Sequence, residues 1–200
     1  MSPGERSQQR RIGLTGGIAS GKSSVGRWLA QQGLPVLDAD QFAREALAPG
    51  SEASTAVLQR YGETVCQGNA TAINRAALGQ IVFNDNAERR WLEQLIHPLV
   101  RQRFDEALRF HAGESTVVLM IPLLFEAGLE GLCSEIWLVD CDPEQQRERL
   151  MARDGLSLDA AQARMAAQWP LSRKRPMADL VIQNRSTPNA WIAEVQQALS

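Results

Sequence analysis

Residues 11–24 read RIGLTGGIASGKSS, and this stretch decides the fold that we predict for the chain. It opens with the short apolar run IGL, which indicates a buried strand. It then passes through residues 16–23, GGIASGKS, which match the pattern G-x-x-x-x-G-K-[ST] at every fixed position. Apolar side chains follow at helical spacing from Val25. Strand, glycine loop and helix therefore arrive in the order that a phosphate-binding P-loop requires.

The glycine loop is suited to hold the phosphates of a nucleotide. Successive backbone N–H groups in such a loop point inward, and the helix that begins near Gly21 adds the positive end of its dipole. We expect the side chain of Lys22 to reach the β- and γ-phosphates and the Ser23 hydroxyl to bind Mg²⁺. The alternative is a glycine-rich turn that binds nothing. The full match with the right flanks favours nucleotide binding, although it does not say which reaction follows.

The composition favours one compact unit without a general affinity for nucleic acid or membranes. The 200 residues are 44% hydrophobic and carry a net charge of −2, which gives no electrostatic attraction to polyanions. Cys66, Cys133 and Cys141 lack metal-ligand spacing and are expected to be reduced thiols. No run approaches the length of about 18 apolar residues that a membrane span needs, and no signal-peptide core precedes the P-loop. We therefore predict a soluble, cytoplasmic protein that binds neither nucleic acid nor membranes. We expect it to be a monomer or a weak homo-oligomer, and the sequence does not decide between the two.

Four further apolar runs predict a parallel sheet. Helical patterns separate them, and the last run precedes a closing helix at residues 188–199. The four runs lie at residues 35–37, 116–121, 135–140 and 179–183. Five short strands alternating with helices indicate a three-layer α/β fold around a five-stranded parallel sheet.

A helical insertion interrupts this alternation at residues 41–111, where helical patterns occur without a clear buried strand. The helices predicted there span residues 42–47, 53–61, 75–83 and 87–110, with breaks at 49–50 and 68–69. His97–Pro98 lies inside the last helix, so we expect a kink or a break at this point. The insertion is too long for a simple βα crossover. We predict that it forms part of a substrate site.

Two carboxylates follow the second predicted strand. Asp38 and Asp40 stand at its carboxyl end, and ligands of open α/β sheets bind beyond the carboxyl ends of strands. Asp38 is our candidate to orient or deprotonate an acceptor hydroxyl, or to hold magnesium through water. Either aspartate could instead cap the helix that follows. We assign that capping role, or a supporting one, to Asp40.

Residues 145–175 are rich in arginine and also contain Lys174, one of only two lysines in the chain. The arginines are Arg147, Arg149, Arg153, Arg164, Arg173 and Arg175. Two helical patterns, 143–153 and 158–168, carry most of them. The segment could be a mobile lid that closes arginines over the transferring phosphate. It could also be a solvated hairpin in which arginines pair with glutamates such as Glu144. Its place between the fourth and fifth strands favours the lid.

Two further polar residues have alternative interpretations. His97 lies beside apolar residues on a helical pattern, so it is either a structural residue or a substrate contact. Glu126 follows the sequence PLLF at the end of the third predicted strand. It could orient a substrate or form a hydrogen bond to a loop.

Other classes of P-loop protein fit the chain less well. A guanine-nucleotide switch needs an N-K-x-D motif, and neither Lys22 nor Lys174 lies in one. A transporter-type ATPase needs a signature helix and a strand that ends in aspartate–glutamate, which residues 116–126 do not offer. The size, the insertion and the arginine-rich segment favour a small-molecule kinase with the P-loop fold.

Seven segments resemble the dephospho-CoA kinase family in order and spacing, and together they span residues 11–184. They are IGLTGGIASGKSSV, DADQFARE, HPLV, VVLMIPLLFE, RERLMARD, RMAAQ and ADLVIQN. The first is common to many kinases, whereas DAD-x-x-A-R, HPL and PLLFE are more specific. The resemblance implies ATP-dependent phosphorylation of the ribose 3′-hydroxyl of dephospho-CoA, with Mg²⁺, as the last step of coenzyme A synthesis.

The resemblance also assigns roles to individual residues, with catalysis by Asp38 and Lys22. It implies nucleotide contacts by Gly17, Ile18, Ala19, Ser20, Gly21, Lys22, Ser23, Ser24, Arg147, Arg153, Arg164 and Asn184. It implies acceptor contacts by Asp38, Arg44, His97, Pro122, Leu123, Leu124 and Glu126, and a magnesium ligand in Ser23. Ala19 and Ser24 replace the family's common glycine and threonine. Alanine is tolerated in place of this glycine if Ala19 keeps a negative φ angle, and Ser24 retains a hydroxyl.

The predicted domain organisation has three parts. The nucleotide-binding core comprises residues 10–40, 112–146 and 177–200. The acceptor-binding insertion comprises residues 41–111, and the lid comprises residues 147–176. Two alternatives to the predicted activity stay open: a regulator that hydrolyses ATP slowly and signals through the insertion, and a kinase whose acceptor is a nucleoside or nucleotide.

Overall fold

The computed structural model describes residues 9–68, 72–185, 187 and 189–200. Position 69 of the predicted break and position 188, the predicted start of the closing helix, lie outside the described residues. The chain divides into two compact units. The first comprises Met1–Asp38 with His111–Ser200, and the second comprises Ala39–Phe110.

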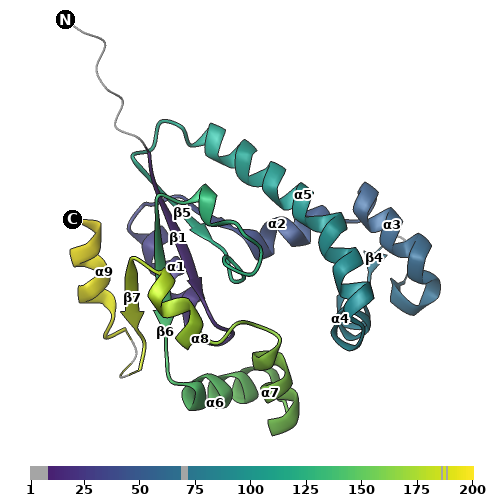
Figure 1. Cartoon of the computed structure of the whole chain (residues 1–200). Helices are drawn as coiled ribbons and strands as arrows, with labels where there is room; N and C mark the ends of the chain where they lie inside the picture. The colour runs from purple at the N-terminus through teal and green to yellow at the C-terminus, as the bar shows by residue number, and fades with distance from the viewer. Residues whose placement is uncertain (1–8, 69–71, 186, 188) are drawn as a thin grey trace, which may run out of the picture. The chain divides into compact units, whose positions relative to one another are not determined.

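The first unit is built on a five-stranded parallel sheet with the strand order β2-β5-β1-β6-β7 (Figure 1). The strands are β1 (Arg10–Gly16), β2 (Val36–Asp38), β5 (Thr116–Met120), β6 (Glu135–Asp140) and β7 (Leu180–Gln183). Strand β1 is central, since it pairs with β5 on one side and β6 on the other. Its Ile12 and Leu14 side chains are fully buried. The predicted five-stranded parallel sheet is confirmed.

Helices cover both faces of this sheet. One hydrophobic cluster joins α1 (Lys22–Gln31) and α9 (Ile192–Leu199) to the strands, and the rings of Trp28 and Trp191 meet edge to face within it. On the other face, Leu171 at the start of α8 (Leu171–Lys174) packs against Leu138 of β6. The predicted three-layer α/β fold is therefore confirmed. Helices α6 (Pro143–Asp154) and α7 (Leu158–Ala166) follow β6.

The second unit is mostly helical. It contains α2 (Ala39–Ala46), α3 (Glu52–Tyr61), α4 (Arg75–Asn84) and α5 (Asn86–Phe110). Phe42 of α2 and Phe104 of α5 pack edge to face. A short antiparallel hairpin, β3 (Cys66–Gln67) with β4 (Ala72–Ile73), also lies in this unit and was not indicated by the sequence.

Helix α5 continues through Pro98, so a break at His97–Pro98 is a wrong prediction, whereas a kink there stays a prediction. A proline inside a helix removes one backbone hydrogen bond and crowds the preceding turn. The packing of the helix outweighs this cost, because Ile96 on one side of Pro98 and Val100 and Phe104 on the other are all buried.

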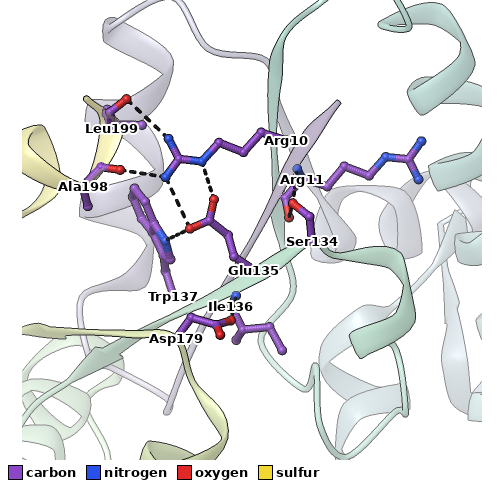
Figure 2. Close-up of polar contacts among 9 residues, drawn as sticks. All are labelled: Arg10, Arg11, Ser134, Glu135, Ile136, Trp137, Asp179, Ala198 and Leu199. Atoms are coloured by element: carbon purple, nitrogen blue, oxygen red, sulfur yellow. Dashed lines mark hydrogen bonds and ion pairs between the residues drawn. The ribbon is translucent and has the colours of Figure 1, made fainter. Parts of the chain in front are cut away.

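Figure 2 shows a polar cluster that joins the amino ends of β1 and β6 to the end of α9. The Arg10 guanidinium donates to both carboxylate oxygens of Glu135 and to the carbonyl oxygens of Ala198 and Leu199. The last carbonyls of a helix have no partner within the helix, so Arg10 completes α9. Burial alone would raise the pKa of Glu135, but hydrogen bonds from Arg10 and Trp137 outweigh it and lower this pKa.

The variant Arg10→Ala should destabilise the first unit. It leaves the partly buried Glu135 carboxylate without its cation and the end of α9 without two hydrogen bonds. We expect a loss of about 2 kcal/mol in the free energy of unfolding, which lowers the midpoint of thermal unfolding by about 4–8 °C. Thermal melts followed by circular dichroism measure this change.

Arg11→Ala is the matched control, because the Arg11 guanidinium points away from the cluster (Figure 2) and donates to Gln9. This control should move the midpoint by only about 1 °C. Equal losses in the two variants would show that the cluster adds no specific stability.

Candidate functional site

The glycine loop lies between β1 and α1, as predicted. Strand β1 ends at Gly16, and α1 begins at Lys22 with Gly21 as its N-cap residue. Lys22 is only 8% exposed, whereas Ser23 and Ser24 in the first turn of α1 are exposed. The loop therefore offers the first backbone N–H groups of α1 and a serine hydroxyl together, which suits an anion with a bound cation.

Two glycines in the loop allow neighbouring groups to approach the backbone closely. A Cβ atom on Gly16 would come within 2.5 Å of Oγ of Ser20 and 2.9 Å of the carbonyl oxygen of Val139. A Cβ atom on Gly21 would lie 2.1 Å from Nδ2 of Asn184, and Gly21 also has a φ of 100°. Oγ of Ser20 is buried and has no hydrogen-bond partner among the residues that the structure describes. Such a hydroxyl fits a site that a ligand completes.

Asn184 fastens the glycine loop to the end of β7. Its side-chain amide donates to the carbonyl oxygen of Ser20 at 2.8 Å. Its backbone N–H donates to the carbonyl oxygen of Asp140, also at 2.8 Å. These two hydrogen bonds give Asn184 a scaffolding role, and its contact with the nucleotide stays a prediction.

Ala19 has a φ of 58°, so it does not keep the negative φ angle at which an alanine is tolerated without strain. The left-handed conformation costs a residue with a Cβ atom about 1 kcal/mol. The tight path of the loop imposes it, because the N–H of Ser20 turns back to donate to the carbonyl oxygen of Gly17 at 3.1 Å.

Asp38 is the last residue of β2 and lies at the carboxyl edge of the sheet. It is in register with Met120 of β5, which in turn pairs with Leu14 of β1. Asp38 therefore stands two strands from β1, a lateral separation of about 10 Å. The sheet brings Asp38 and the glycine loop to the same edge. Asp40 lies in the first turn of α2, in the second unit.

The segment that follows β5, residues 122–126, also lies at this edge. The carbonyl oxygen of Pro122 accepts a hydrogen bond from Oγ1 of Thr15, next to the glycine loop, at 3.2 Å. Leu123 is 37% exposed and can touch a ligand, whereas Leu124 is fully buried and offers a ligand no surface.

Of the two roles considered for Glu126, the structure shows the hydrogen bond to a loop. Its Oε1 accepts from the backbone N–H of Trp169 at 2.9 Å and lies 2.8 Å from Nζ of Lys174. Lys174 is fully buried, and no role was predicted for it from the sequence. The scarcity of lysine, in a chain whose other basic residues are mostly arginine, is the sequence feature that could have pointed to Lys174.

The three arginines assigned to the lid each have an acidic partner. Arg147 pairs with Glu144 at 3.0 Å, one helical turn earlier. Arg153 and Arg164 both pair with Asp154, at 2.7 and 2.9 Å, which joins α6 to α7. The hydrogen bond from Arg153 is the main cause that lowers the pKa of Asp154. Each arginine has to leave its partner to reach a phosphate, and the lid role stays a prediction.

Asp140, the last residue of β6, is a buried carboxylate whose role was also not predicted from the sequence. It pairs with Arg175 at 3.0 Å and with Arg185 at 2.5 Å. Both arginines line a cavity of about 630 Å³, together with Gln146 and Gln168. A Cβ atom on Gly17 would meet the Gln146 side chain, so this cavity adjoins the glycine loop.

Arg44 and His97 belong to the second unit. Arg44 lies on α2 and His97 on α5, and both side chains are exposed. Exposure makes both available to a ligand. Their contacts with an acceptor stay predictions.

Within the described ranges, no three or more His, Cys, Asp or Glu side chains gather where they could hold a metal ion. A magnesium ion bound through Ser23 and phosphate oxygens needs no such cluster, because Mg²⁺ takes much of its coordination from substrate and water. No helix in the same ranges has the length and apolar character to cross a membrane.

Comparisons with known proteins agree along almost the whole chain. The family model described as dephospho-CoA kinase matches residues 10–189. A dephospho-CoA kinase of Synechococcus sp. (strain CC9605) is 71% identical over 199 residues, which cover 100% of this chain and 96% of that protein. The structure of a dephospho-CoA kinase from Campylobacter jejuni matches with a TM-score of 0.72 at 27% identity, covering 96% of both chains. A shikimate kinase from Bacteroides thetaiotaomicron shares the fold alone, with a TM-score of 0.56 at 16% identity over 95% of this chain and 98% of that one.

The variant Ala19→Gly should stabilise the protein slightly. Glycine removes the left-handed penalty of about 1 kcal/mol but makes the unfolded chain more flexible, so we expect a net gain of about 0.5 kcal/mol. Urea unfolding measures it. Ala30→Gly is the control, because Ala30 is an exposed residue inside α1 and should lose about 1 kcal/mol. A loss of the same size at both positions would contradict a strained Ala19.

Proposed function

The chain belongs to the dephospho-CoA kinase family, and we propose that it transfers the γ-phosphoryl group of ATP to the ribose 3′-hydroxyl of dephospho-CoA. The products are ADP and coenzyme A, so the reaction is the final step of coenzyme A biosynthesis. One structural observation supports this proposal independently of family membership: the glycine loop and Asp38 lie at the same edge of the sheet.

We propose that residues 17–24 bind the phosphates of ATP. The backbone N–H groups at the start of α1 and the ammonium of Lys22 would lie against the β- and γ-phosphates, where they stabilise the charge on the transferring group. The buried Oγ of Ser20 supports this assignment, since it has no hydrogen-bond partner among the described residues. Ser23 would hold Mg²⁺, which supplies neutralisation of phosphate charge when bound.

On the acceptor side, Asp38 is the proposed base. It would accept the proton of the 3′-hydroxyl as that oxygen forms a bond to the γ-phosphorus, while the bond to the β-phosphate oxygen breaks and ADP leaves with the electron pair. The other proposed acceptor contacts are Arg44, His97, Pro122 and Leu123, while Glu126 would act on the acceptor only through the 122–126 segment, since its Oε1 is held by Trp169 and Lys174. Leu124 anchors its segment from within the core, which its full burial supports.

The remaining assignments concern the lid and the setting of the enzyme. We propose that Arg147, Arg153 and Arg164 exchange their acidic partners for phosphate when α6 and α7 close, and that Asn184 borders the nucleotide. We also propose a cytoplasmic monomer. The three cysteines are all free thiols, which suits a reducing compartment.

The direct test is a coupled assay with purified protein, MgATP and dephospho-CoA. We expect formation of ADP and coenzyme A in equal amounts, with Lys22→Ala as the control that loses the phosphate contact. Nucleosides and nucleotides serve as parallel acceptors. Turnover with one of these alone would replace the proposed acceptor. ATP binding without turnover on any acceptor would favour a regulator.

The variant Asp38→Asn should keep ATP affinity and lose turnover. An amide cannot take the proton of the acceptor hydroxyl, and positioned acid–base groups contribute about 100-fold or more to rate. Steady-state kinetics and a nucleotide-binding measurement separate the two effects. Asp40→Asn is the matched control, and its turnover should stay within about threefold of the parent. Parent-like turnover of Asp38→Asn would return Asp38 to the helix-capping role.

A further inference from the structure

Residues 168–174, which we call the strap, run from the end of α7 through α8 and contact two separate parts of the proposed active site. At one end, Oε1 of Gln168 accepts a hydrogen bond from the backbone N–H of Ile18 in the glycine loop at 2.9 Å. At the other end, Lys174 reaches the segment that follows β5. The strap therefore touches both the nucleotide side and the acceptor side of the sheet edge.

The Lys174 end of the strap is held by a buried ion pair. The Lys174 side chain is fully buried and the Glu126 side chain is 15% exposed, with Nζ and Oε1 2.8 Å apart. Nζ also lies 3.5 Å from the carbonyl oxygen of Pro122. One ammonium thus contacts the first and the last residue of the 122–126 segment and fixes its length and direction.

Only one oxygen of the Glu126 carboxylate contacts the strap. Oε1 is shared between Lys174 and the backbone N–H of Trp169. Oε2 is buried and has no hydrogen-bond partner among the described residues. A buried carboxylate oxygen in this state carries a desolvation cost, so stability alone does not account for the arrangement.

An ion pair of this kind is weak evidence for stability in any protein. Replacing both charges of a buried pair by neutral groups is often harmless, whereas removing one partner is strongly destabilising. Phosphoryl transfer, in contrast, depends on positioning, and an error of about 1 Å can cost 100-fold in rate. Fixed contacts from one short segment to both sides of the site meet that requirement.

We propose that the strap is a positioning element for phosphoryl transfer. Lys174 and Glu126 hold residues 122–126 against the acceptor, and Gln168 holds the glycine loop at Ile18, so that the two sides of the reaction keep a fixed separation. The strap residues touch neither the transferring phosphate nor the proton. This inference rests on the proposed function, because the acceptor side is defined by it.

The test is the double variant Lys174→Met/Glu126→Gln. It removes both charges together, and the glutamine still accepts the hydrogen bond from Trp169. We expect a melting temperature within about 3 °C of the parent. We also expect kcat with dephospho-CoA to fall by about tenfold or more, with the KM for ATP within about threefold. Because the stability is retained, a purely structural pair predicts no change in kcat.

A second measurement does not need activity. Hydrogen exchange at the amide of Ile18 reports whether the glycine loop is held by the strap, and we expect it to quicken by about tenfold in the double variant and in Gln168→Leu. Arg10→Met/Glu135→Gln is the matched control, because it removes an ion pair of the same unit at the opposite edge of the sheet. It should change neither kcat nor exchange at Ile18.

The outcomes are separable. Parent-like kcat together with parent-like exchange at Ile18 in the double variant overturns the strap proposal. If the double variant does not fold, Gln168→Leu decides by the same two readouts. If the parent protein itself fails to phosphorylate dephospho-CoA, the proposed function is wrong, and exchange at Ile18 alone decides whether the strap holds the loop.

Discussion

Strand β1 is paired with a parallel strand on each side, β5 along residues 10–14 and β6 along residues 12–16, and the arrangement of the proposed site depends on this pairing. Leu14 lies in register with Met120 on one side and Trp137 on the other. The carboxyl ends of parallel strands lie at the same edge of the sheet, so the segments that follow the strands lie close together there. The glycine loop, Asp38 and Asn184 come from three different strands and meet at this edge for that reason.

The groups at this edge are held mainly by hydrogen bonds between a side chain and a distant backbone. Asn184 binds the carbonyl of Ser20, and Glu126 binds the N–H of Trp169. Contacts of this kind restrain the backbone without occupying the N–H groups at the start of α1. They restrain the shape of the loop around the proposed phosphate site. The three arginines of the proposed lid are arranged differently, since each is paired with a carboxylate on the same helix or the neighbouring one.

The sequence predicted those parts of the molecule that depend on neighbouring residues. The glycine loop and all five strands of the sheet were found because their signals are local: fixed glycine positions and continuous apolar runs. A break at Pro98 was a wrong prediction, and the positive φ of Ala19 was not predicted, because the burial of one helix face and the path of the loop override local preference. The ion pair between Lys174 and Glu126 joins residues 48 positions apart. No periodicity in a single sequence reports such a contact.

The scarcity of lysine has a practical consequence for chemical studies of the protein. Both lysines are buried, with Lys22 in the glycine loop and Lys174 at the end of the strap. Acylating reagents need a solvent-accessible, uncharged amine, so neither side chain is a ready target while these two regions stay packed. Any opening of the loop or the strap would expose one of them. The rate of lysine acylation therefore reports how often the loop or the strap opens locally.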